Sequence, residues 1–148
     1  MIYSVYKYRG GVREMNYKIL MIILVMFFSG CSSRVYSGEM DVLETRMISF
    51  DDCYSEYITV VVNTKELEDY ERCAQDIIER YITNSFTSVD FCFDEIGYPN
   101  ELNAVVFLTE ENVEEWKPIF EMSYRTDSFD YNIKDDSERY TLKIKSNV

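Results

Sequence analysis

The 148-residue chain contains no histidine, and its 15 basic side chains face 27 acidic ones. Without histidine, one chain cannot build a Ser-His-Asp triad, a Cys-His pair or a zinc site with imidazole ligands. The net charge of −12 also excludes the basic surface that a nucleic-acid-binding protein needs to neutralise phosphates. Hydrophobic residues nevertheless make up 47% of the chain, which is enough to build a folded core.

Long hydrophobic runs are also lacking, because the longest one covers only residues 19–28. A membrane-spanning helix needs about 20 apolar residues, so this run is too short to cross a bilayer. A basic residue, Lys18, precedes the run, and the small residues Ser29 and Gly30 follow it, directly before Cys31. A positive charge, a short apolar run and small residues in this order are typical of a secretory signal peptide.

The run together with Ser29-Gly30-Cys31 resembles the lipobox of bacterial lipoproteins, although Phe28 stands where that family more often has leucine. The resemblance implies cleavage between Gly30 and Cys31 and attachment of a diacylglyceryl lipid to the Cys31 thiol. It therefore predicts a signal peptide over residues 1–30, with translation starting either at Met1 or at Met15. It also predicts a lipidated cysteine and short tether over 31–39, and a single domain over 40–148. The expected location is the extracytoplasmic side of the cell membrane.

Periodicity in the mature chain predicts an α+β domain. Residues 57–63 are apolar on both faces and predict a buried strand, and 104–108 predict another. Apolar residues three and four apart predict helices over 65–83 and from 110 to about 124, the second one broken at Pro118. Alternation predicts strands at 89–93 and 140–144 and suggests one at 129–133. Residues 40–50 fit either a helix or a strand.

Taken in order, these elements predict the ferredoxin-like split βαβ fold, in which two helices cover one face of an antiparallel sheet, with an added C-terminal hairpin. The other face would then be open, unless residues 40–50 cover it. Alternation assigns six residues to this face as a candidate partner surface: Thr59, Val61, Asn63, Asp90, Cys92 and Asp94. The lysines at 143 and 145 and Thr141 join them if the last strand continues the sheet.

The sequence offers few groups for catalysis. Cys53, Cys73 and Cys92 are expected to be free thiols, because the predicted fold keeps them too far apart for disulfides. Acidic residues often stand in adjacent pairs, but no calcium-binding loop motif and no glycine-rich nucleotide motif occurs in the mature chain. We therefore expect no metal and no cofactor. The expected function is a non-enzymatic, lipid-anchored domain that binds a protein or small ligand. The alternative is a carboxylate-based hydrolase, since two carboxylates suffice for glycoside hydrolysis.

Overall fold

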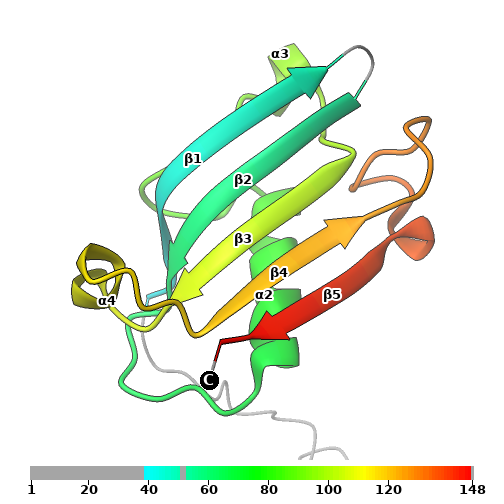
Figure 1. Cartoon of the computed structure of the whole chain (residues 1–148). Helices are drawn as coiled ribbons and strands as arrows, with labels where there is room; N and C mark the ends of the chain where they lie inside the picture. The colour runs from blue at the N-terminus through cyan, green and yellow to red at the C-terminus, as the bar shows by residue number, and fades with distance from the viewer. Residues whose placement is uncertain (1–38, 51–52, 148) are drawn as a thin grey trace, which may run out of the picture. The chain divides into compact units, whose positions relative to one another are not determined.

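A five-stranded sheet forms the centre of the domain in the computed structural model, which describes residues 39–50 and 53–147 (Figure 1). The strands lie in chain order: β1 (Asp41–Phe50), β2 (Cys53–Val61), β3 (Glu101–Phe107), β4 (Phe120–Arg125) and β5 (Thr141–Ser146). Strands β2 and β3 are parallel, and the other neighbouring pairs are antiparallel. The prediction of an α+β domain is confirmed, with a mixed rather than an antiparallel sheet.

The helix α2 (Tyr70–Ile82) connects the two parallel strands and crosses one face of the sheet (Figure 1). It buries Cys73, Ala74, Ile77 and Tyr81, and the spacing of these residues defines one face of a helix. Opposite them, alternate residues of the strands enter the same core: Val42, Ile58, Val60, Leu102, Ala104, Val106, Phe120 and Met122. The main hydrophobic core therefore lies on the α2 side of the sheet.

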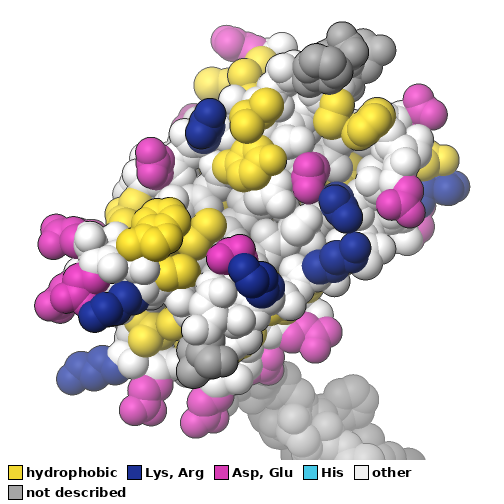
Figure 2. Space-filling model, in the orientation of Figure 1, with side chains coloured by type: hydrophobic (Ala, Val, Ile, Leu, Met, Phe, Trp, Pro, Cys, Tyr) yellow, Lys and Arg dark blue, Asp and Glu magenta, His cyan; other side chains and the backbone are white. Residues whose placement is uncertain are grey.

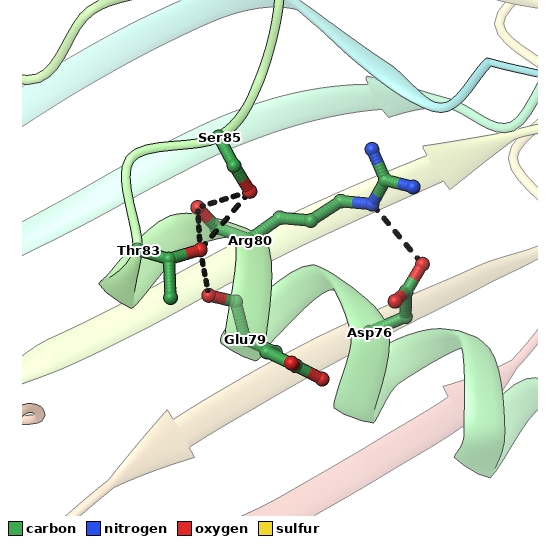
Figure 3. A network of polar contacts seen from close by, with 5 residues as sticks. All are labelled: Asp76, Glu79, Arg80, Thr83 and Ser85. Carbon is green, nitrogen blue, oxygen red and sulfur yellow. Dashed lines mark hydrogen bonds and ion pairs between the residues drawn. The ribbon is translucent and has the colours of Figure 1, made fainter.

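Local hydrogen bonds determine where α2 begins and ends. The predicted start at residue 65 is wrong, because Asp69 caps the helix by accepting a 2.8 Å hydrogen bond from the backbone N–H of Arg72. At the other end, the hydroxyl of Thr83 donates to the carbonyl of Glu79 at 2.7 Å (Figure 3). The helix ends within one residue of the predicted end at residue 83, and Asn84 after it has a positive φ of 51°.

The strand predicted at residues 89–93 does not form. The side chain of Asn84 satisfies both backbone groups of Phe91: its amide oxygen accepts from the N–H at 3.0 Å, and its amide nitrogen donates to the carbonyl at 3.1 Å. A short helix, α3 (Phe93–Ile96), follows. The alternating aromatic rings reach the core from this loop instead, with the ring centroid of Phe91 4.6 Å from that of Tyr81.

The second long helix is also absent from the described residues. The helix α4 (Glu110–Glu114) ends after five residues, and the chain turns at Trp116, which has a φ of +51°. Pro118 follows two residues later and cannot donate the backbone hydrogen bond that a continuing helix would need. The apolar residues at 120, 122 and 124 then lie on β4.

These changes replace the ferredoxin-like order. In that order another strand would separate the two strands joined by the first helix, whereas β2 and β3 are direct neighbours here. The missing strand at 89–93 explains the difference, because no segment remains to insert between them. Residues 41–50 form edge strand β1 and pair with β2, so they extend the sheet and form no helix over its open face. The predicted final strand is confirmed as β5, while residues 129–133 form a loop.

Candidate functional site

The face of the sheet that points away from α2 is the candidate functional site, and Figure 2 views the molecule from this side. Strand register arranges its side chains in rows that run across the strands. The first row contains Arg46, Tyr57, Asn103, Ser123 and Lys143. The second row contains Glu44, Thr59, Val105, Glu121 and Lys145. We call these ten residues the open face.

A groove of about 550 Å³ runs over both rows. This volume lies within the range of ligand-binding sites in proteins. Its floor is mainly neutral, because half-buried Thr59, Asn103, Val105 and Ser123 occupy the central strands. The side-chain nitrogen of Asn103 is buried and has no hydrogen-bond partner among the described residues. The groove therefore offers hydroxyl groups to an occupant, and the amide of Asn103 is free to donate once its side chain turns toward the groove.

Positive charge lies at both edges of this groove. Arg46 stands on β1, and Lys143 and Lys145 stand on β5, at the opposite edge of the sheet. Lys145 lies 3.5 Å from the carboxylate of Glu121. Within residues 39–50 and 53–147, neither Arg46 nor Lys143 forms an ion pair. Two cations of the open face are thus available to an anionic group.

One end of this sheet face is closed by the segment that contains α4 (Figure 1). Phe107 lies next to Val61 in the register, and its ring centroid is 5.6 Å from that of Trp116. Val61 is only 1% exposed and Phe107 is fully buried. The prediction that Val61 is accessible at the middle of the face is therefore wrong, because the turn after β3 covers it.

The structure divides the six residues predicted for the partner surface among four places, one of them the buried position of Val61. Thr59 lines the groove as predicted, and Thr141 shares its face through the register of β4 and β5. Asn63 follows the end of β2 and donates a 2.6 Å hydrogen bond to the carbonyl of Glu39. Asp90, Cys92 and Asp94 were assigned to this face because a strand was predicted there.

These last three residues line a separate, smaller hollow of about 350 Å³ beside the end of α2. The amide of Asn84 donates to Asp90 across 2.5 Å, which holds the loop against the helix. Cys92 is exposed and precedes α3. The residues predicted to share one sheet face are thus separated, and those that follow β2 in the chain do not belong to the groove.

The structure records the three cysteines at 53, 73 and 92 as free thiols, as predicted. Cys73 is completely buried in the core on α2. Burial raises the pKa of its thiol to about 12, with the nearby carboxylate of Asp76 adding to the effect. A thiol with this pKa stays protonated at neutral pH and is a poor nucleophile. Cys73 therefore acts as a core residue.

Glu56 is a buried carboxyl group, only 3% exposed, that was not among the residues predicted from the sequence. It lies on the α2 side of β2, where it accepts hydrogen bonds from the hydroxyls of Thr45 and Tyr54, the latter at 2.6 Å. Burial and the bond to Glu56 raise the pKa of Tyr54. Because Glu56 alternates with Ile58 and Val60 along β2, the pattern could have placed it inside. Its two hydrogen-bond donors satisfy the buried carboxyl group there.

A second acidic residue, Asp41, fastens the loop after α2 to the start of β1. Its carboxylate accepts backbone hydrogen bonds from Thr87 and Ser88, each at 3.1 Å, and one from the Ser88 hydroxyl at 2.5 Å. Burial alone would raise the pKa of Asp41, but these hydrogen bonds outweigh it and lower the pKa. The carboxylate is therefore ionised at neutral pH and serves the fold.

Neither a metal site nor a membrane span is found in the part of the chain that the structure describes. Within it, no three Cys, Asp or Glu side chains are grouped so that they could hold a metal ion. No helix in the same ranges is long and apolar enough to cross a bilayer. The predicted lipidation site at Cys31 and the cleavage site at Gly30 lie outside the described residues. The chain matches no protein-family model, no curated protein and no solved structure.

Proposed function

We propose that the chain is a lipid-anchored, extracytoplasmic binding protein whose open face contacts a ligand or partner protein. The observation that carries the binding role is the groove over the two rows, which leaves Tyr57 40% exposed at the centre of a sheet. The lipid anchor rests on the sequence around Cys31 alone. The anchor would hold the domain near the membrane, and the open face would remain available to an occupant from outside.

The arrangement of carboxylates favours binding over hydrolysis. Glu44 and Glu121 both line the groove, but they stand on β1 and β4, three strand spacings apart. This places their backbones about 14 Å from each other. Glu121 also pairs with Lys145 on β5, on the side away from Glu44. A glycosidase needs its two carboxyl groups within about 5–10 Å, so this pair does not suit that chemistry.

Photo-crosslinking in living cells tests the binding role. Tyr57 is replaced by p-benzoylphenylalanine, which keeps an aromatic ring in the groove. The matched control carries the same residue in place of Ile96, a 49% exposed residue on α3 and outside the groove. We expect a specific adduct from position 57 and none from position 96. Adducts from position 96 alone, or from neither position, would contradict the proposal.

The anchor has a separate test, because the thiol of Cys31 would be the site of lipid attachment. We expect cells that make the wild-type protein to incorporate labelled palmitate into it, and cells that make Cys31→Ser to accumulate an unlabelled precursor. Cys92→Ser serves as the matched control and should label like the wild type. Equal labelling of the Cys31→Ser variant would refute lipidation at this residue, without bearing on the open face.

A further inference from the structure

The charge of the open face differs in sign from that of the rest of the domain. The described residues include 24 acidic and 10 basic side chains. When the row that contains Glu101 and Arg125 is added to the open face, these three rows hold three of these acids but four of these bases. The remaining described surface is strongly acidic. An anionic occupant is therefore attracted to this face and repelled elsewhere.

The spacing of the cations sets the length of this occupant. Arg46 and Lys143 stand at opposite ends of one row, four strand spacings apart. This distance is about 19 Å. A single small anion cannot reach both, whereas about six residues of extended polypeptide span it. An occupant that pairs with both cations would therefore carry anionic groups near both of its ends.

The floor between the cations indicates what lies in the middle of the occupant. Tyr57 and Val105 present an exposed ring and a half-buried aliphatic side chain there. Asn103 adds the unpartnered amide donor, which suits a backbone carbonyl. A densely charged polymer such as heparin matches neither feature. It would also be repelled by the acidic surface around the groove.

We propose that the groove binds an extended segment of a partner protein in which acidic residues flank an apolar one. The acidic side chains would pair with Arg46 at one edge and with Lys143 at the other. The apolar side chain would contact Tyr57 and Val105 between them. This proposal rests on the open face being the binding surface, and it names the chemistry of the partner.

Selection from a library of random heptapeptides displayed on phage tests the proposal directly. The bait is the full chain in detergent. We expect the selected peptides to be enriched in Asp and Glu on both sides of an apolar residue, and their binding to weaken as the salt concentration rises. Selected peptides without an excess of acidic residues, or no selected peptide at all, would overturn the proposal.

Charge reversal then locates the site. The variant Arg46→Glu with Lys143→Glu should reduce the affinity for the selected peptides at least tenfold. The control, Lys65→Glu with Arg72→Glu, makes the same change in net charge at exposed positions outside the groove and should change the affinity less than twofold. If the first variant fails to fold, Arg46→Gln with Lys143→Gln removes the charges without reversing them and should still weaken binding. Equal binding by both charge-reversal variants would refute the proposal.

The outcomes also separate this proposal from the binding role of the face. Neutral peptides that lose affinity in Tyr57→Ala would leave the open face as the binding surface and refute the acidic partner. A different outcome is that acidic peptides bind Tyr57→Ala and the charge-reversal variant with the same affinity as the wild type. That result would place binding elsewhere and refute both the acidic partner and the binding role of the open face. Binding of heparin or inorganic phosphate that depends on Arg46 and Lys143, without selection of peptides, would assign the groove to an anion that is not a protein.

Discussion

Replacing Val61 with arginine should unfold much of the protein, whereas the same change at Thr59 should be tolerated. The two residues lie two positions apart on β2, and both point away from α2. Val61 is 1% exposed beside fully buried Phe107, while Thr59 lines the groove. The comparison therefore measures where the open face ends.

The expected difference follows from the cost of burying a charge. Asp41 lies opposite Val61 in the register, but its carboxylate already accepts hydrogen bonds from Thr87 and Ser88. An arginine at position 61 would therefore be buried without a free partner, or would push the α4 segment away. A buried charge that lacks its partner costs about 3–5 kcal/mol. An arginine at position 59 reaches solvent and lies between Glu44 and Val105 in its row, so the change should stay within about 0.5 kcal/mol.

Urea unfolding followed by circular dichroism gives both free energies of unfolding. Thr59→Arg is the matched control for Val61→Arg, because it introduces the same side chain on the same strand and face. A Val61→Arg variant as stable as the wild type would show that the α4 segment does not close this end of the face. A strongly destabilised Thr59→Arg variant would show that the groove is not open.

Three further predictions concern the buried polar groups and the thiols. Glu56→Ala should lower the free energy of unfolding by about 1–3 kcal/mol in urea titrations, because it removes a buried acceptor that binds the hydroxyls of Thr45 and Tyr54; an unchanged value would contradict this role. Asp41 has a pKa lowered by folding, so its contribution is complete above about pH 4 and is lost as the pH falls through the lowered folded-state pKa. Asp41→Asn should therefore cost about 1 kcal/mol at pH 7 and make stability less dependent on pH below 4, and equal pH profiles would refute the effect. In the native protein, mass spectrometry should find that a maleimide modifies exposed Cys92 at least ten times faster than buried Cys73, whose thiol has a pKa of about 12; equal rates would contradict the burial.

The elements with one unambiguous period could be predicted from the sequence. Strands β2 and β3 contain β-branched and apolar runs, and the spacing of the apolar residues in α2 fits only a helix. The segment from 116 to 124 was assigned to a helix because apolar residues four positions apart fit both a helix and a strand. Pro118 marked the break, but the pattern did not reveal that Phe120 begins a strand.

The composition of the open face was harder to predict than the fold class. Thr59 and the lysines of β5 were found because simple alternation holds along those strands. On β1 the register shifts between Val42 and Glu44, and this bulge determines that Arg46 reaches the groove. Because the pattern of residues 40–50 fits a helix as well as a strand, the position of this bulge could not be predicted from the sequence. Asp90 was misplaced because the competing hydrogen bonds of Asn84 are tertiary and do not follow from periodicity.

The most direct test of the account is to map the binding site of a selected acidic heptapeptide by amide chemical shifts in the ¹⁵N-labelled protein. We expect shifts that cluster at Tyr57, Asn103, Ser123 and Lys143, which form one row across β2 to β5. The same titration of the Arg46→Glu, Lys143→Glu variant should require at least ten times more peptide. Shifts that cluster instead around α2 or the hollow beside Asp90 would contradict the claim that the open face is the binding surface.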